Sequence, residues 1–324
     1  MRLRGERDLL SAPGRVAAPA RNGPLLVLSG AILWGTAGAS QQLLGDAVPP
    51  FVVGSLRTVL GGAALVAVAL LARRHAPTGI DVPVALMPRR HARAMLLLAG
   101  VCIAAYQVAF FIGVRSLGIA VGTILAIGAA PFFAGAAAAL AGQGRATRRW
   151  LLHTGLAVLG LVLLVRPSGE VPLSVPGLVA ALLAGLSFGV FTVLTKGLLA
   201  RGVPRIDAVA MPFGIAAVLL LPVLAIGLRA AEGAGELLRP AGIMVVLWLA
   251  LGATAAGYVL FIAGLRGVTA VVGTTLVLAE PLTAALLGVL VFAERLDAVA
   301  TTGALLVAAA LVLTAARPGA VVAR

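Results

Sequence analysis

Long apolar runs separated by short polar connections make up most of this chain, and the pattern predicts membrane-spanning helices. The runs are about 20 residues long and lack the alternation of a strand, so helices are favoured over the strands of a barrel. The ten runs are 25–40, 51–72, 93–114, 119–141, 150–166, 175–199, 206–228, 241–264, 269–292 and 297–316. We therefore expect an all-α integral membrane fold with ten transmembrane helices. The run 150–166 has only 17 residues, which is at the short end for a crossing.

The composition argues against a soluble protein. Hydrophobic residues make up 61% of the chain and charged residues 11%, whereas soluble domains contain about 25% charged residues. A net charge of +14 would suit nucleic acid only if it covered one face of a soluble domain, and no such domain is apparent. Cys102 is the single cysteine, and the three histidines lack the spacing of metal ligands. We therefore expect no nucleic acid partner, disulfide, metal or cofactor.

The positive charges are distributed unevenly between the two sides of the predicted bundle. With the N-terminus inside, the inner segments hold 19 of the 25 Lys and Arg residues, the outer loops hold five, and Arg57 lies within a span. Such an excess is typical of the cytoplasmic side of a membrane protein. Both termini are therefore predicted to be cytoplasmic, in a multi-pass protein of the cell (inner) membrane. Residues 1–24 are predicted to be a disordered basic tail, and residues 317–324 a second tail.

The chain also matches itself. Residues 110–123 align with residues 261–274 at an offset of 151, with six of fourteen pairs identical. Pro131 matches Pro281, and Trp34-Gly35 corresponds to Phe188-Gly189. Apolar stretches rich in glycine and alanine resemble one another by chance, but several matches in the same order at similar offsets favour a duplication.

The duplication predicts two repeats of opposite orientation, 25–166 and 175–316. Each repeat holds five spans, so matched helices must cross the membrane in opposite directions. Inverted repeats are a transporter architecture, with a binding site near the midplane that interrupted helices at matched positions indicate. We therefore expect Pro131 and Pro281 to break their helices and to take part in gating.

The order and spacing of several short motifs resemble those of the EamA-type transporters of the drug/metabolite transporter superfamily, over about residues 25–316. The matching motifs are Trp34-Gly35, Leu56-Arg57, Pro131, Glu280-Pro281 and Glu294-Arg295-Leu296. The resemblance implies a bacterial inner-membrane carrier that exports small metabolites or drugs. It also implies a central cavity lined mainly by spans one to four and six to nine, with spans five and ten at the periphery.

Two charged residues within spans are the first candidates for a substrate-binding site. Glu280 is the only carboxylate deep in a span, where a charge costs about 2.5–3.5 kcal/mol on insertion scales. It could bind a proton or an amine, or it could be a structural acid beside the kink. Arg57 could attract an anionic group or pair with Glu280, or its side chain could extend to the membrane interface.

The remaining candidates are uncharged. Three of them, Trp34, Tyr106 and Tyr258, could stack on a solute and form hydrogen bonds with it, or they could anchor span ends at the interface. Gln41 and Gln107 must find polar partners in a bilayer, either a substrate or a neighbouring helix. Thr275 precedes the kink and could contact solute or satisfy a backbone group.

Together these features predict a secondary active transporter that works by alternating access. We expect it to export small metabolites, amino-acid-like or amphipathic, or drugs, with a proton at Glu280 as a coupling ion. The lipid bilayer is its other expected partner, and the protein could also form a homodimer. The alternative is an intramembrane enzyme acting on a lipid or isoprenoid, but the deep spans lack the paired carboxylates or the nucleophile and base that such chemistry usually needs.

Overall fold

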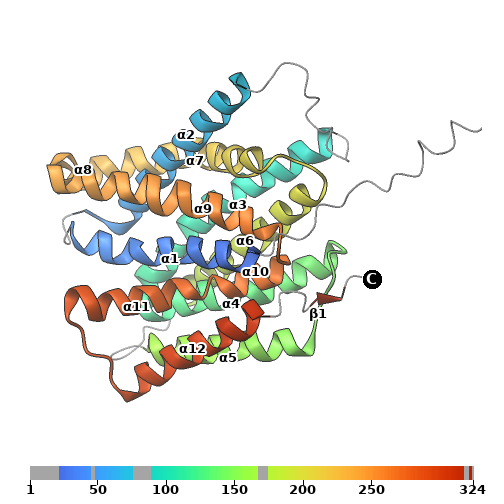
Figure 1. Cartoon of the computed structure of the whole chain (residues 1–324). Coiled ribbons are helices and arrows are strands. Elements are labelled where there is room, and N and C mark those ends of the chain that lie inside the picture. The colour runs from blue at the N-terminus through green and yellow to red at the C-terminus, as the bar shows by residue number, and fades with distance from the viewer. Residues whose placement is uncertain (1–21, 45–47, 76–88, 167–173, 317–320, 323–324) are drawn as a thin grey trace, which may run out of the picture.

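The computed structural model describes residues 22–44, 48–75, 89–166, 174–316 and 321–322, and nearly all of them are helical (Figure 1). The predicted tails 1–24 and 317–324 lie mostly outside these ranges. The first half contains α1(Gly23–Gln42), α2(Pro50–Arg74), α3(Arg89–Leu117), α4(Ile119–Leu140) and α5(Arg148–Leu164). The second half contains α6(Val175–Ala200), α7(Arg205–Ala230), the short 3-10 helix η2(Ala234–Leu238), α8(Pro240–Leu247), the π-helix η3(Trp248–Ala256), α9(Gly257–Leu265), α10(Ala270–Leu276), α11(Ala279–Phe292) and α12(Ala298–Ala316). Two short strands, β1(Arg145–Ala146) and β2(Val321–Val322), pair antiparallel.

The helices confirm the fold class predicted from hydropathy. Within the described residues, nine helical spans of 18 residues or more are apolar enough to cross a membrane, and the tenth predicted span is the 17-residue helix α5. No end of a predicted run differs from the observed helix by more than four residues. Side-chain caps fix where three helices begin. The side chains of Thr147, Ser174 and Thr269 accept hydrogen bonds from backbone N–H groups in the first turn of the helix that follows each of them.

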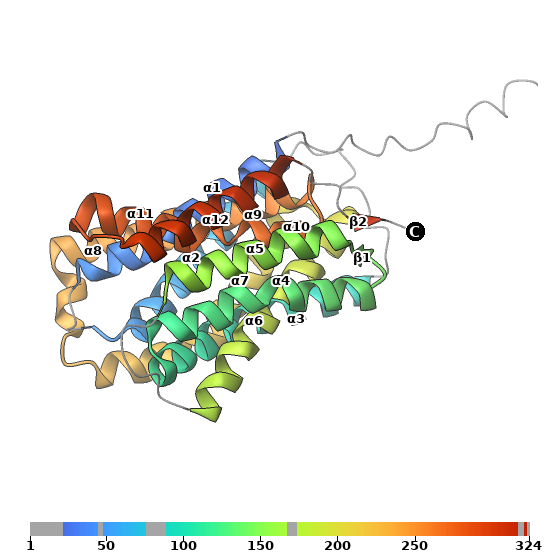
Figure 2. The same cartoon turned by 90° about the horizontal axis from the view of Figure 1, so that it is seen from below.

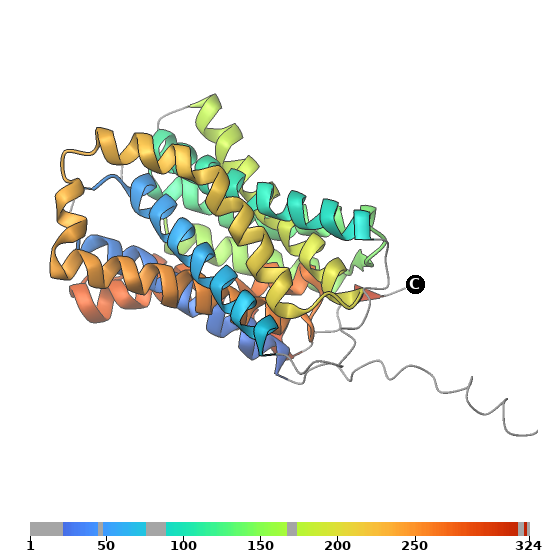
Figure 3. The ribbon, with the colours of Figure 1, turned by 90° about the horizontal axis from the view of Figure 1, so that it is seen from above.

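The helix contacts have the two-fold pattern expected of inverted repeats. α3 packs on α6 as α9 packs on α1, and α4 packs on α6 as α11 packs on α1. The equivalent helices α5 and α12 lie side by side at the lower edge of the bundle in Figure 1 and face the viewer in Figure 2, and α2 and α7 lie side by side at the opposite edge, which faces the viewer in Figure 3. The first described helix begins, and α12 ends, at the same end of the bundle (Figures 1 and 2).

Close contacts at two glycines obey the same symmetry. A Cβ added to Gly35 of α1 would lie 2.6 Å from the carbonyl oxygen of Glu280, and one added to Gly189 of α6 would lie 3.0 Å from that of Ala130. Gly35 matches Gly189 in the repeat, and Glu280 matches Ala130. Small residues let membrane helices approach this closely. Each repeat therefore packs the glycine of its first helix on the other repeat, beside the matched proline.

The prediction of matched helix breaks is correct at Pro281 and wrong at Pro131. Span nine is interrupted between α10 and α11, and the Val277 carbonyl accepts a hydrogen bond from the Glu280 N–H at 2.8 Å. Pro281 lies in the first turn of α11, where its missing N–H costs nothing. α4 instead continues through Pro131 from Ile119 to Leu140, because a helix packed among other helices tolerates the loss of a single backbone hydrogen bond.

Span eight departs from regular helix in a way that the sequence did not predict. Its middle third is the π-helix η3, between α8 and α9. π-Helical turns are rare and often occur at functional sites. Within the described chain, irregular segments interrupt spans eight and nine. Both of these spans belong to the second repeat.

Candidate functional site

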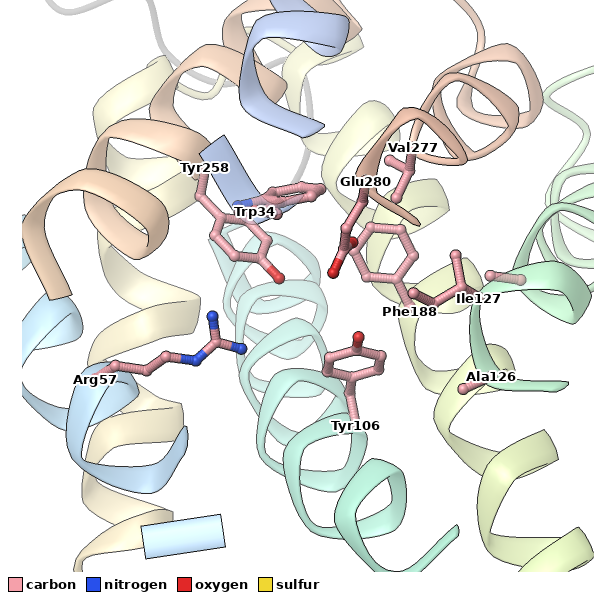
Figure 4. A pocket seen from close by; sticks show the side chains of 10 residues that line it. Trp34, Arg57, Tyr106, Ala126, Ile127, Phe188, Tyr258, Val277 and Glu280 are labelled. Carbon is pink, nitrogen blue, oxygen red and sulfur yellow. The ribbon is translucent and has the colours of Figure 1, made fainter. Parts of the chain in front are cut away.

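A cavity lies among the helices of both repeats, and Figure 4 shows the side chains that line it. It encloses about 450 Å³ not occupied by atoms, part of it continuous with solvent. Its lining comes from α1, α2, α3, α4, α6, α9 and both sides of the break in span nine. The lining residues are Trp34, Arg57, Tyr106, Ala126, Ile127, Ala130, Phe188, Tyr258, Val277 and Glu280. We call this space the central cavity.

Four aromatic rings form the frame of the central cavity. The ring centroids of Trp34 and Tyr258 are 4.5 Å apart, those of Tyr106 and Phe188 are 5.8 Å apart, and the edge-to-face contact of Trp34 with Phe188 spans 6.1 Å. Trp34 matches Phe188 in the repeat, and Tyr106 stands at nearly the same offset from Tyr258. The two aromatic pairs are therefore equivalent under the inverted symmetry, and each repeat contributes to both of them.

Glu280 breaks this symmetry. The break in span nine places it in the first turn of α11, and its carboxylate points into the central cavity (Figure 4). The positive end of a helix dipole favours a negative charge at such a position. The matched residue of the first repeat, Ala130, also lines the cavity but contributes only a methyl group.

Arg57 faces the same space from α2. Its guanidinium group points toward the region into which the hydroxyl groups of Tyr106 and Tyr258 also point (Figure 4). Within the described residues, Arg57 and Glu280 do not form an ion pair within 4.0 Å, so the alternative in which they pair directly is wrong for this conformation. The cavity therefore presents one positive and one negative group that do not neutralise each other by contact.

Trp34 offers a further polar group. Its side chain is buried, and its indole Nε1 has no hydrogen-bond acceptor among the described residues. A buried N–H without an acceptor costs about 1–3 kcal/mol. Gly257 of α9 makes room for this edge of the ring, because a Cβ there would lie 2.6 Å from Nε1.

Three predicted site residues do not line the central cavity. Gln41 lies at the end of α1. Gln107 turns its buried amide toward α2, where a Cβ on Gly54 would lie 2.3 Å from Nε2. It follows Tyr106 by one residue, and successive residues of a helix point about 100° apart.

The third, Thr275, belongs to a buried cluster with the peripheral helix α5. Its hydroxyl accepts a hydrogen bond from the Trp150 Nε1 at 3.0 Å and lies 2.9 Å from the Thr154 hydroxyl. It also lies 3.0 Å from the Val271 carbonyl oxygen of its own helix. These contacts hold α10 against α5 next to the break and leave Thr275 no free group for a solute.

Sequence reasoning missed half of the lining. The missed residues are Ala126, Ile127, Ala130, Phe188 and Val277. The match of Phe188 with Trp34 in the repeat was a usable signal. The small and aliphatic residues carry none, because every face of these helices is apolar. The described residues contain no group of three or more His, Cys, Asp or Glu side chains that could hold a metal ion.

Comparisons with known proteins agree with this architecture. The EamA-like transporter family matches the chain twice, over residues 21–166 and 175–316. The chain is similar to the "Uncharacterized transporter YwfM" of Bacillus subtilis (strain 168), with 37% identity over 294 residues that cover 91% of this chain and 94% of the relative. It is also similar to a solved structure described as "Crystal structure of protein", with a TM-score of 0.68 and 19% identity over 90% of this chain and 96% of the other. At that identity the last similarity supports the fold alone.

Proposed function

The chain belongs to the EamA-like transporter family, and from this premise we propose that it is a secondary active transporter that exports small amphipathic or amino-acid-like metabolites, or drugs, across the bacterial inner membrane. The family and the apolar spans make it a multi-pass membrane transporter. The observation that carries the finer proposal is the central cavity, where Arg57 and Glu280 face a common space framed by four aromatic rings.

The charges and rings together suit a solute with both polar and apolar parts. Two half-buried charges that do not pair are costly, since each has lost part of its water without gaining a partner. A solute carrying an ammonium and a carboxylate group would give Glu280 and Arg57 a partner each. Its apolar part would contact Trp34 and Phe188, and the tyrosine hydroxyl groups would donate or accept hydrogen bonds.

Glu280 is also the proposed site of a coupling proton. A carboxylate in the cavity can hold either a proton or the cationic group of a solute, and competition between the two would couple their movements in opposite directions. Among the residues that the structure describes, Glu280 is the only acidic one that lines the central cavity, so within that cavity this exchange would depend on Glu280.

The inverted repeats supply the two conformations that alternating access requires. Exchanging the conformations of the two repeats would turn a site open to one side into a site open to the other. The break between α10 and α11 is a point at which span nine could bend during this exchange. The excess of positive charge in the segments at the end of the bundle where α1 begins and α12 ends supports placing that end in the cytoplasm.

Counterflow in proteoliposomes tests the proposal. The purified protein is reconstituted and offered amino acids, nucleosides and cationic drugs, together with analogues that lack the ammonium or the carboxylate group. We expect counterflow of at least one zwitterionic or amphipathic solute. Its apparent affinity should fall about tenfold or more in Arg57→Gln and in Glu280→Gln, since a hydrogen bond to a charged group contributes about 1.5–3 kcal/mol.

Two matched variants control for charge alone. Arg115 lies exposed in the last turn of α3, and Glu232 lies exposed after α7. Neither lines the central cavity, so Arg115→Gln and Glu232→Gln should transport like the wild type. Absence of counterflow for every class of solute, or equal losses in the control variants, would contradict the proposed function.

A further inference from the structure

A second cavity lies between the repeats, at the end of the bundle where the described chain begins and ends. It encloses about 560 Å³ not occupied by atoms, part of it continuous with solvent. We call it the terminal pocket. Its lining residues are Ala138, Gln143, Lys196, Gly197, Ala200, Arg201, Thr269, Ala270 and Val271. They come from the end of α4 and the following loop, the end of α6 and the start of α10.

The terminal pocket and the central cavity lie along the same three elements. α4, α6 and span nine line the central cavity near their middles and the terminal pocket at one end. A small buried cluster lies along these elements between the two sets of lining residues, formed by Ala134, Ala138, Val193 and Ala270, of which Ala138 and Ala270 also line the terminal pocket. These are small side chains, and they come from both repeats. A solute that passed between the two spaces along α4, α6 and α10 would therefore have to displace only a few small side chains.

The terminal pocket is positively charged. Lys196 is the single lysine of the chain, and its ammonium group donates hydrogen bonds to the carbonyl oxygens of Leu265 at 2.6 Å and Arg266 at 3.4 Å. The guanidinium group of Arg201 donates to the Gly197 carbonyl at 3.0 Å. Within the described residues, no acidic side chain lines the pocket and neither cation forms an ion pair within 4.0 Å. Both charges thus have only neutral carbonyl partners.

Gln143 adds an acceptor beside these donors. Its Nε2 donates to the Val193 carbonyl at 2.9 Å, while its buried Oε1 has no donor among the described residues. A ligand that carries an anionic group together with an N–H or O–H group would satisfy all three side chains. The flexible stem of a lysine lets its ammonium turn from a carbonyl to a stronger, charged acceptor.

We propose that the terminal pocket is an anion site, at which Lys196 and Arg201 bind the carboxylate or phosphate group of a solute before it enters the central cavity. The anion site follows from the charges and hydrogen bonds of the pocket. Its place on the transport route rests on the proposed function. A phosphate group could also come from a lipid headgroup at the membrane surface, which shares the same chemistry, and the experiment separates the two sources.

Lys196 permits a direct test, because an amine-reactive reagent can modify only its side chain and the chain's α-amino group. Full-length protein in phosphatidylcholine nanodiscs is labelled with such a reagent, and mass spectrometry quantifies the peptide containing Lys196. Sodium acetate and inorganic phosphate are the probes, with sodium chloride at equal ionic strength as reference. A bound anion should slow labelling by a factor of about 1 + [L]/Kd, roughly tenfold when the anion is at ten times its Kd.

The variant Arg201→Gln should weaken this protection, and Arg205→Gln, at an exposed arginine outside the pocket, should leave it unchanged. Equal labelling in acetate, phosphate and chloride would overturn the anion site. Protection that appears without added anion once phosphatidylglycerol replaces part of the phosphatidylcholine would assign the anion to lipid and overturn its assignment to solute. Because labelling requires no transport, these outcomes are independent of the counterflow experiment. If counterflow depends on Arg57 and Glu280 but anions do not protect Lys196 from labelling, only the anion site is refuted.

Discussion

The contact between Gly35 and span nine gives the sharpest test of the inverted packing. A Cβ added at Gly35 would lie 2.5 Å from the Thr283 Cβ and 2.6 Å from the Glu280 carbonyl oxygen, whereas ordinary contacts of a Cβ are 3.4–4 Å. The variant Gly35→Ala therefore forces α1 and α11 apart by close to 1 Å. The matched variant Gly189→Ala would place its Cβ 2.8 Å from the Ala134 backbone nitrogen and 3.0 Å from the Ala130 carbonyl oxygen, which requires a smaller shift.

Two opposing effects determine how much stability each alanine variant loses. Overpacking a tight interior typically costs about 1–3 kcal/mol, while alanine stabilises a helix by about 0.5–1 kcal/mol relative to glycine. We expect Gly35→Ala to be destabilised by about 1–2 kcal/mol and Gly189→Ala by less. Gly38 of the same helix α1 is the matched control, because no atom of the described residues lies within 4 Å of a Cβ added there. Gly38→Ala should be as stable as the wild type or slightly more stable.

The exposure of Cys102 on heating provides the assay of stability. Cys102 is the single cysteine and is buried in α3, so a thiol-reactive fluorophore reports its exposure as the purified protein is heated in detergent. The expected order of apparent Tm is Gly35→Ala lowest, then Gly189→Ala, then wild type together with Gly38→Ala. Displacement of the Glu280 backbone should also slow counterflow in Gly35→Ala more than in Gly189→Ala. A Gly35→Ala variant as stable as Gly38→Ala would refute this account of the packing.

Two further predictions concern stability away from the central cavity. Thr275→Val leaves the Trp150 Nε1 with only the Val271 carbonyl at 3.3 Å, so it should lose about 1–3 kcal/mol in the same thermal assay with unchanged solute affinity. The control is Thr314→Val, whose hydroxyl, in the part of the chain that the structure describes, bonds only its own helix; an equal loss there would contradict the role of the cluster with α5. The backbone N–H of Ala300, followed by the nearby Arg166 guanidinium, holds the pKa of Asp297 below its ordinary value of 3.8. The stability that the Asp297 carboxylate adds is therefore present above the ordinary pKa and lost as pH falls through the lowered one. The apparent Tm of wild type should exceed that of Asp297→Asn at about pH 5 and lose this advantage in stronger acid, whereas a difference independent of pH would contradict the assignment.

Hydropathy and self-similarity predicted most of the fold. The apolar runs gave every span to within four residues of its ends, because the thickness of the bilayer sets the length of a helix. The odd number of spans in each repeat predicted the opposite orientations that the packing of Gly35 and Gly189 shows in detail. A lone proline, in contrast, does not decide whether a helix breaks. Pro131 lies within a continuous helix, and Pro281 follows a break.

The site was harder to predict because polarity does not reveal which face of a membrane helix points inward. Trp34, Arg57, Tyr106, Tyr258 and Glu280 were identified by their chemistry, and all of them line the central cavity. Gln107 and Thr275 have equally polar groups but lie on faces that contact other helices. On a helix that is apolar all round there is no hydrophobic stripe to orient it. Only the packing determines those faces.

The most direct test of the central claim is the rate of solute efflux from proteoliposomes, measured from about pH 6 to pH 8 for wild type and Glu280→Gln. If Glu280 exchanges a proton for solute, the wild-type rate depends on pH, and the variant loses most of its rate and all of that dependence. The central cavity would then be the site where solute and proton compete. Efflux by Glu280→Gln at the wild-type rate, with the wild-type dependence on pH, would contradict the account.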